Sequence, residues 1–353
     1  NSKLNRRKQP VNDEIKKYYK MLSPEIPEFL YGYIDTKAMR RIGKISCWCG
    51  TDLTNVFENK YPYSNLEHSI AVALIVWNFT KDKKQTLAGL FHDIATPTFK
   101  HCIDFMNGDY KKQESTEEQT REIIENSEEI MALLKRDNVK VEEVMDYHIY
   151  PIADNDTPKL SSDRLEYTFT NGIYFDKPVW DLNTIKEIYE DIEILTNEDN
   201  IQELGFKNIE IAEKFIEGAS KLWPKWISNE DKTTMQFIAD IVREMNKNGL
   251  LEIKDLYKYS EKEIVQKIKN CGIPRIQEGF DKFQKATRVY GSDKPVPNKY
   301  CVSIEAKRRY IIPLVKQKDK ARRITEVSKE AKEIIEKYLN HKTEKYSYFD
   351  FNF

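Results

Sequence analysis

The stretch GLFHDIATPTFKH, residues 89–101, holds two of the chain's five histidines, and one of them stands directly before an aspartate. The pair His92-Asp93 ends an apolar run that has the character of a buried helix. Charged side chains are costly to bury unless a partner compensates them, and a bound cation is one such partner. The dipeptide alone is weak evidence, because a chain with many aspartates produces His-Asp pairs by chance. Whether the pair binds a metal must therefore be judged from the neighbouring segments.

A second apolar segment lies upstream, LEHSIAVALIVW at residues 66–77. Its periodicity predicts a helix in which His68 stands one turn before Val72 and two turns before Ile75, so that its side chain projects from the packed face. A lone histidine in such a place is usually a core residue with a hydrogen-bond partner. Because two apolar helices each present a histidine, we favour one ligand bound by both histidines.

A third segment, LSSDRLEYTF at residues 160–169, begins a predicted helix with Asp163 in its first turn. An acid at the start of a helix is favoured by the helix dipole, so Asp163 by itself needs no further explanation. In chain order, however, the candidates read His68, His92-Asp93 and Asp163.

This order resembles the HD superfamily of metal-dependent phosphohydrolases, and within it the deoxynucleoside triphosphate triphosphohydrolase (dGTPase-like) branch. The resemblance covers about residues 29–175. The segments that carry it are Ile34-Asp-Thr36 with Arg40-Arg41, Leu66-Glu-His-Ser69, His92-Asp-Ile94 with Phe99-Lys-His101, and Asp163-Arg-Leu-Glu-Tyr167.

The resemblance implies a helical HD bundle whose metal ligands are His68, His92, Asp93 and Asp163. Two imidazoles and two carboxylates suit a divalent ion such as Mn, Fe, Ni, Co or Zn. Such an ion lowers the pKa of a bound water and neutralises charge at a phosphate. The family further implies that Asp93 bridges the ion and the nucleophilic water, and a Mg ion at a substrate phosphate is an additional expectation.

The chain departs from the branch at two positions. The branch has a histidine three residues after the HD aspartate, where this chain has Thr96, and another in the next helix, where the best match is Glu117. His101 and Asp104 match the branch's nearby His and Asp, so we expect His101, Asp104 and Glu117 to form the catalytic set. Three explanations stay open: a carboxyl carries the proton in a changed mechanism, the substrate differs (a monophosphate or a cyclic ester), or the site binds without turnover.

The resemblance also implies substrate contacts. Arg164 would face the phosphates and Tyr167 the sugar, and Asn171 stands where the branch often has an aspartate that contacts the ribose. Asn65 stands where the branch often has a phosphate-contacting arginine, and Lys100 is a further candidate for phosphate. The alternative is a solvated charge for Arg164 and Lys100 and core packing for Tyr167.

The other histidines and the cysteine pair carry weaker signals. His148 has a possible parallel in HD enzymes that hold a second metal, but we favour an ordinary helix histidine, and His341 is expected on the surface. Cys47-Trp-Cys49 is spaced too tightly for a usual zinc site and is assigned to packing. Five cysteines and no secretory segment are typical of a cytoplasmic protein with free thiols.

Composition excludes several classes of protein. The 57 basic and 58 acidic residues nearly cancel, which argues against bulk attraction to nucleic acid or to an acidic membrane. No apolar run approaches the roughly 18 residues of a membrane span. Only 12 glycines in 353 residues, with many charged helix formers, favour a mainly α protein.

Apolar residues recur at helical spacing within residues 66–77, 123–134, 212–223, 235–245 and 331–339. Pro224 is expected to stop the third of these helices, and Ser328 to cap the last. Residues 300–304 and 310–315 are β-branched and aromatic and read as strands, with Pro313 placing the second at an edge. The expected fold class is therefore mainly α, a helical bundle with a small C-terminal β-hairpin and helix.

The turn-rich segment at residues 291–298 marks the last boundary. We divide the chain into an N-terminal helical arm at residues 1–28, an HD metal-binding core at 29–180, a helical extension of the same domain at 181–290, and a small β plus helix tail at 291–353.

Two functions of different kinds follow from these observations. The first is a metal-dependent phosphohydrolase acting on a nucleotide or a related small phosphate ester, with an altered acid/base set. The second is a catalytically weak HD-fold nucleotide sensor or regulatory module, which the departures at Thr96 and Glu117 motivate. A homo-oligomer is expected from the resemblance alone, and the short basic run at residues 318–323 reads as a solvated face rather than a nucleic-acid site.

Overall fold

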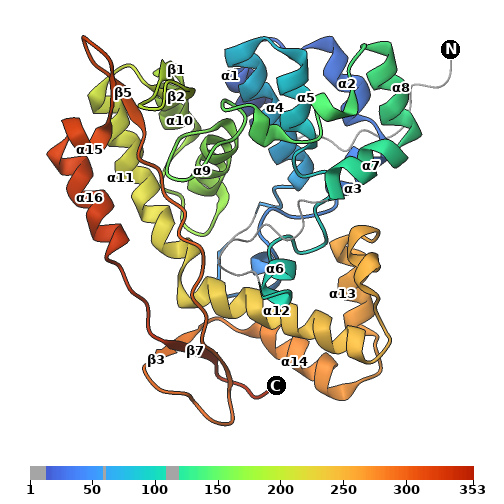
Figure 1. Ribbon diagram of the computed structural model, residues 1–353. Helices are drawn as coiled ribbons and strands as arrows, with labels where there is room; N and C mark the ends of the chain where they lie inside the picture. Colours follow the sequence, from blue (N-terminus) through green and yellow to red (C-terminus); the bar gives the residue numbers. More distant parts are fainter. Residues whose placement is uncertain (1–12, 59–60, 109–118) are drawn as a thin grey trace.

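The computed structural model describes residues 13–58, 61–108 and 119–353, and more than half of these residues lie in α- or 3-10 helices (Figure 1). The expected mainly α class, with strands in the C-terminal part, is confirmed. In the part of the chain so described, no helix is long and apolar enough to cross a membrane.

The first part of the chain packs its helices around α4, which is the centre of the candidate site. Residues 71–76 of α4 are all buried, so this helix is enclosed on every side. It begins at a capping box, in which the Ser64 hydroxyl accepts from the Glu67 amide and the Glu67 carboxylate accepts from the Ser64 amide. The helices are α1 (Asp13–Leu22), α2 (Glu28–Ile34), α3 (Lys37–Ile42), α4 (Asn65–Thr80), α5 (Lys83–Phe91), α6 (Cys102–Met106), α7 (Thr120–Asn126), α8 (Glu128–Arg136) and α9 (Ser162–Tyr174).

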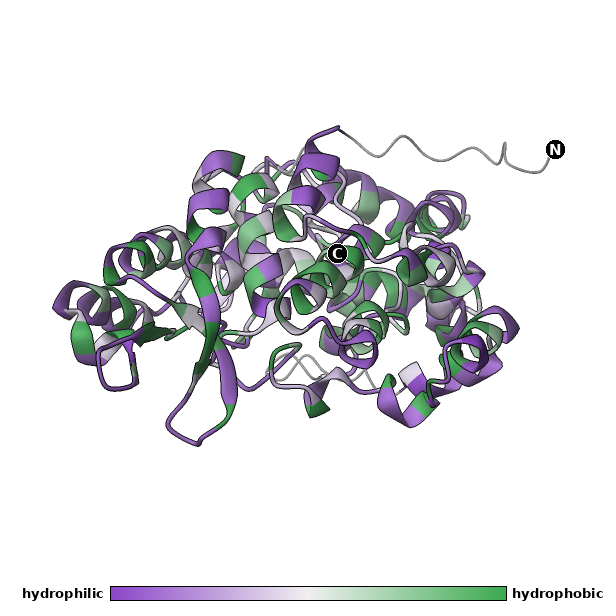
Figure 2. Cartoon of the chain, turned by 90° about the horizontal axis from the view of Figure 1, so that it is seen from above, coloured by the Kyte–Doolittle hydropathy of each residue, from purple (hydrophilic) through white to green (hydrophobic). Residues whose placement is uncertain are grey.

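The second part adds helices on two sides of this bundle. They are α10 (Leu182–Glu190), α11 (Ile209–Trp226), α12 (Asn229–Lys247), α13 (Glu261–Lys269), α14 (Pro274–Lys285), α15 (Ile324–Val327) and α16 (Lys329–Leu339). One hydrophobic core joins α4, α5, α9 and α11, whereas a second core forms around α12 and α14. We call them the first core and the second core. Figure 2 shows hydrophobic residues gathered toward the interior and hydrophilic residues on the outer helices.

Within the described residues, seven short strands form two sheets. One has the order β1-β2-β5-β6, from β1 (Ile192–Thr196), β2 (Gln202–Phe206), β5 (Leu314–Lys316) and β6 (Ala321–Arg323). The other has the order β3-β7-β4, from β3 (Tyr290–Ser292), β7 (Tyr346–Phe349) and β4 (Tyr300–Val302). The two strands expected from the sequence are present in shorter form as β4 and β5, but they belong to different sheets. The C-terminal hairpin is β5 with β6, and α15 and α16 follow it.

The expectation that Pro313 lies in an edge strand is wrong. β5 lies inside its sheet, between β2 and β6, and Pro313 stands just before it. A proline at that place removes no hydrogen bond from the ladder, and its carbonyl accepts from the Ile324 amide at 2.9 Å.

The expected helices are present, with two differences. Helix α11 continues through Pro224 to Trp226, so Pro224 does not stop it. The lost hydrogen bond falls near the helix end, and the fully buried Trp223 anchors the same turn. The stripe at residues 123–134 is divided at Ser127, whose hydroxyl caps α8. Ser328 caps α16 as expected, accepting from the Ala331 amide.

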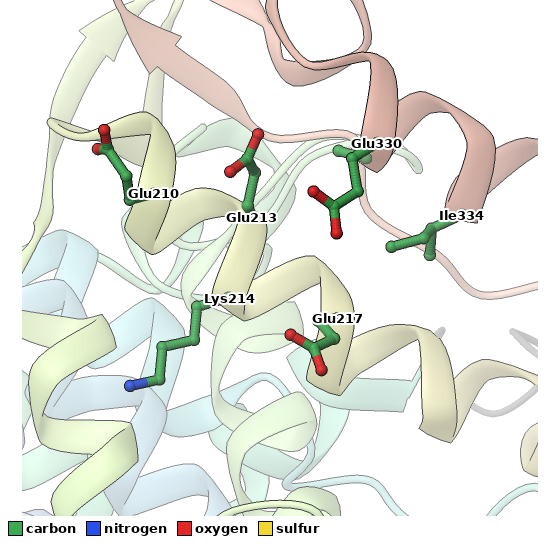
Figure 3. Close-up of a pocket in the computed structure, with 7 residues that line it drawn as sticks. Glu210, Glu213, Lys214, Glu217, Glu330 and Ile334 are labelled. Carbon is green, nitrogen blue, oxygen red and sulfur yellow. The ribbon is translucent and has the colours of Figure 1, made fainter.

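Helices α11 and α16 pack side by side, and a groove of about 190 Å³ lies between them. Figure 3 shows Glu210, Glu213 and Glu217 of α11 across from Glu330 of α16. The Ser328 hydroxyl donates to the Glu213 carboxylate at 2.6 Å, which ties the start of α16 to α11.

The division of the chain into an arm, core, extension and tail stays a prediction. In the structure α1 packs against α4 and α10, and the segment after residue 291 is shared between the two sheets.

Candidate metal centre

His68 lies in the first turn of α4, and its side chain is buried. Its Nδ1 is 2.5 Å from Oε2 of Glu166, and Glu166 also accepts from the Tyr63 hydroxyl. Glu166 and Tyr63 are both fully buried. Because a carboxylate holds Nδ1, the other ring nitrogen, Nε2, is left to face the centre of the site.

His92 is the first residue after α5, and its ring is fixed from the opposite side. Its Nδ1 is 2.7 Å from the Gly89 carbonyl, which can only accept, so Nδ1 carries the proton. The Nε2 lone pair of His92 therefore points away from α5, and it lies 3.2 Å from Nε2 of His68.

Asp163 enters the site from the first turn of α9, whose start is capped by Ser161. Its Oδ1 is 3.1 Å from Nε2 of His68 and 3.6 Å from Nε2 of His92. Its Oδ2 accepts from the Tyr147 hydroxyl at 3.1 Å. The structure thus brings His68, His92 and Asp163 together from three separate helices.

Asp93 lies at the edge of this cluster. Its Oδ2 is 3.4 Å from Nε2 of His92 and 3.9 Å from Nε2 of His68. The same oxygen is 3.1 Å from Nζ of Lys100, which also donates to Oδ1 of Asn65 at 2.7 Å. Asp93 is therefore placed between the cluster and a buried cation.

The distances fit the donor set of a divalent ion. Ligand atoms about 2.1 Å from an ion lie about 3.0 Å apart at a right angle and about 3.4 Å apart at a tetrahedral angle. The separations among His68, His92 and Asp163 are 3.1, 3.2 and 3.6 Å. Imidazole nitrogens together with carboxylate oxygens suit a borderline transition metal.

The electrostatics of the cluster also favour a cation. Burial acts to lower the pKa of His68, but the Glu166 and Asp163 carboxylates outweigh it and raise that pKa to about 10. Burial acts to raise the pKa of Asp163, but His92 and His68 hold it well below its usual range. The cluster therefore attracts positive charge, and a metal ion satisfies the same carboxylates as a proton does.

The residues expected to transfer protons are only partly described. Nδ1 of His101 is 2.7 Å from Oδ2 of the fully buried Asp104, and burial lowers the pKa of His101. Thr96 is buried, with its carbonyl accepting from Arg41 at 2.8 Å. Glu117 lies outside the described residues.

A cavity of about 440 Å³ opens beside the cluster, and His68, Asp93, Asp163 and His101 line it. Arg164 also lines it, but its guanidinium is turned to the loop before α9. It donates to Oδ1 of Asn155 at 2.6 Å and to the Asn155 carbonyl, and it lies 3.5 Å from Asp154. The expected phosphate contact of Arg164 stays a prediction, and this geometry gives the side chain another partner.

Tyr167 and Asn171, one and two turns further along α9, face the same cavity. The Tyr167 ring packs edge-on against Trp226 with ring centroids 5.5 Å apart. Asn171 accepts from the Trp226 indole at 3.0 Å through its Oδ1. Aromatic residues thus form one side of the cavity.

His148 lies at the rim of the cavity, with a side chain that is 47% exposed. It is 2.9 Å from Asp146 and 3.2 Å from Asp154, in a short 3-10 helix. His341 is exposed, as expected. All five cysteines are free thiols, and Cys47 and Cys49 line the cavity.

Sequence reasoning missed several residues of the site. Glu166 lies in the same motif as Asp163. Its spacing of three residues from Asp163 places both side chains on one face of the helix and could have predicted its presence in the site. Asp231, Lys307 and Arg309 also line the cavity. They come from distant parts of the chain, and nothing in the local sequence distinguishes them from surface charges.

Comparisons with known proteins agree with this geometry. Residues 65–166 match the family described as HD domain, and all four expected ligands lie within that range. The Bacillus subtilis (strain 168) protein YdhJ, described as uncharacterized, is 27% identical over 110 residues, which are 31% of this chain and 33% of that protein. The match therefore spans about a third of that relative.

Two solved structures share the fold over most of their length. A phosphohydrolase from Bacteroides thetaiotaomicron has a TM-score of 0.64 at 15% identity, covering 92% of this chain and 96% of the other. A hypothetical protein from Aquifex aeolicus has a TM-score of 0.58 at 16% identity, covering 92% and 93%. At such low identity these likenesses concern the fold alone.

Proposed function

We propose that this chain, which carries an HD domain at residues 65–166, is a metal-dependent phosphohydrolase that cleaves a phosphate ester of a nucleotide or a related small molecule. One observation carries the proposal. His68, His92 and Asp163 converge within 4.8 Å, and this cluster opens into a cavity large enough for a small molecule. We further propose the dGTPase-like branch as the nearest group within the superfamily, on the motifs around His92 and Asp163.

The residues of the cluster have separate roles in this proposal. His68, His92, Asp163 and Asp93 would hold a divalent ion, which supplies charge neutralisation at the phosphate and a water of lowered pKa. Asp93 is the carboxylate at the edge of the cluster. Burial acts to raise its pKa, but His92 and then Lys100 outweigh burial and hold that pKa well below its usual range, so Asp93 stays ionised. It is therefore placed to orient a water by accepting a hydrogen bond.

His101 is the proposed proton carrier on the cavity wall. His101 lines the cavity, and Asp104 accepts from its Nδ1, so in this proposal the other ring nitrogen would carry the proton. Burial keeps the pKa of His101 below its usual value, which suits a group that gives up a proton near neutral pH. This pair, which matches a His and an Asp of the branch, would act without the histidines that the branch has at the positions of Thr96 and Glu117.

The test begins with metal analysis of the purified protein. About one transition-metal equivalent per chain is expected, because one donor cluster is present in the described residues. His92→Ala should lose it, whereas His341→Ala, at an exposed histidine, should keep it. An absence of metal in the wild type, even after Mn²⁺ is added, would contradict the proposal.

Turnover is tested on the metal-loaded protein with deoxynucleoside triphosphates, nucleoside monophosphates and cyclic phosphate esters, by following phosphate release and nucleotide products. Asp93→Ala should abolish the activity. Activity that survives this change would refute the assignment of the site. Ligand-dependent stabilisation without product would instead favour the regulatory, nucleotide-binding function.

A further inference from the structure

Two of the cationic side chains that line the cavity are engaged by protein groups around the metal cluster. Lys100 is 3.1 Å from Asp93 and donates to Asn65 at 2.7 Å. Arg164 donates to Asn155, to the Lys159 carbonyl and to Ser161. Several of the N–H groups of both side chains therefore already have protein partners.

Two further cations reach the cavity from the C-terminal part of the chain. Lys307 and Arg309 lie on the segment between β4 and β5, which runs from one sheet to the other past the helical bundle (Figure 1). The segment is fixed beside α9, because the Ile312 amide donates to the Pro158 carbonyl at 2.8 Å and Ile311 is buried.

Side chains alternate along this segment. Lys307 and Arg309 line the cavity, whereas the guanidinium of Arg308, between them, donates to the carbonyls of Tyr338 and His341 on the other side. This is the period of two that an extended backbone imposes. Two positive charges are therefore directed to the cavity and one away from it.

Arg309 lines the same cavity as His68 and Asp163 of the metal cluster. Burial acts to lower the pKa of Arg309, but Tyr167, to which the guanidinium hydrogen-bonds, and then the Asp163 carboxylate outweigh burial and raise that pKa. Burial raises the pKa of the Asp231 carboxyl, another group of the cavity wall, and the positive charge of Arg309 acts to lower it. Arg309 is thus positioned by neighbours from α9 and α12.

We propose that Arg309, together with Lys307, forms an anion subsite that binds a phosphate group of the ligand in the cavity beside the metal cluster. The identity of the ligand as a phosphate compound rests on the proposed function. A guanidinium suits this task because its planar N–H groups match two phosphate oxygens at once and it stays charged at all physiological pH values. The subsite takes the role that the sequence assigned to Arg164.

The experiment measures binding of inorganic phosphate to the full chain, by calorimetry or by ³¹P NMR, first without metal and then with Mn²⁺. The variants are Arg309→Ala, Arg309→Lys and Arg308→Ala, where Arg308 is a matched control one residue away. Thermal unfolding verifies that each variant is folded, and Arg309→Gln replaces Arg309→Ala if the alanine variant fails that test. Metal content is measured for every variant.

We expect Arg309→Ala to weaken phosphate binding about tenfold or more, since a hydrogen bond to a charged group is lost. Arg309→Lys should recover part of the affinity, because it restores the charge but not the planar pair of donors. Arg308→Ala should stay within about twofold of the wild type, and metal content should not change in any of them.

The subsite is overturned if Arg309→Ala leaves the phosphate affinity unchanged, or if Arg308→Ala lowers that affinity as much as Arg309→Ala does. It is also overturned if the wild type shows no measurable phosphate binding. The two proposals fail in different ways. If the chain binds no metal but phosphate binding still depends on Arg309, the hydrolase proposal fails and the subsite stands. If metal and turnover are present and Arg309→Ala changes nothing, the subsite fails alone.

Discussion

His68 is held at both of its ring nitrogens. Nε2 faces His92 and Asp163, and Nδ1 meets Glu166, which Tyr63 also contacts. A carboxylate on the far nitrogen of a ligand histidine fixes the ring's orientation and raises its basicity. Since Glu166 follows Asp163 by three residues, a single turn of α9 supplies one candidate ligand and the support of another.

Replacing Glu166 by glutamine should therefore weaken metal binding by about 10- to 100-fold. The change keeps the size of the side chain and removes the charge that holds His68. Competition with a chelator for Mn²⁺ or Zn²⁺ measures the affinity. Glu203→Gln is the matched control, because Glu203 is equally buried but pairs with Arg323 in the sheet. An affinity within about twofold of the wild type in Glu166→Gln would contradict this role.

At the scale of single residues, the sequence could indicate candidate metal ligands but not which side chains contact one another. His68 and His92 were identifiable because they interrupt apolar helices, and Asp163 because it follows them in a recognisable order, and the structure brings the donor atoms of the three together. The orientation of Arg164 was not, since it depends on the path of the loop at residues 154–159. Arg309 carries no local signal at all, because its place depends on long-range packing.

At the scale of elements, helices were easier to predict than strand partners. A helix such as α16 is defined by its own periodicity and cap, whereas β2 pairs with β5 from more than a hundred residues away. Short strands carry too little pattern to specify a distant partner. Proline effects also depend on context, since Pro224 is tolerated in the last turn of α11 where packing of Trp223 holds the helix.

Ser328→Ala should lower the free energy of unfolding by about 1 to 2 kcal/mol. The change removes the cap at the Ala331 amide and the hydrogen bond to Glu213 of α11. Urea denaturation followed by circular dichroism measures it. Ser220→Ala, a less buried serine within α11, should stay within about 0.5 kcal/mol of the wild type. Equal effects in both variants would argue against a capping role.

At the scale of the whole molecule, the two large hydrophobic cores of the described residues meet beside the site. Composition and periodicity predicted a helical protein, and the structure bears this out. They could not predict that α12 and the segment before β5 complete the cavity, since such contacts join parts of the chain far apart in sequence. Glu261, at the start of α13, makes another such contact, because its carboxylate accepts from the Phe99 amide at 3.3 Å.

Glu261 should make the stability of the molecule depend on pH. Burial, with the nearby Asp52, raises the pKa of Glu261 from 4.5 to about 8. The folded state therefore binds this proton more tightly than the unfolded state does. Its stabilising contribution is complete below about pH 4.5 and is lost as pH rises through about 8.

The free energy of unfolding should accordingly fall by a few kcal/mol at most between about pH 5 and pH 8. Glu261→Gln, which cannot ionise, should show a shallower fall in urea denaturation over the same range. Glu278→Gln makes the same charge change at an exposed position and serves as the control. An identical slope for Glu261→Gln and the wild type would contradict the assignment.

The cavity has walls from both cores, with Trp48 belonging to the first core and Met235 to the second. The cavity therefore lies between the first core and the second core. A small molecule that contacts both walls acts as a crosslink, because the two cores cannot part until it leaves. The free energy of unfolding of the chain should therefore rise with the concentration of such a ligand.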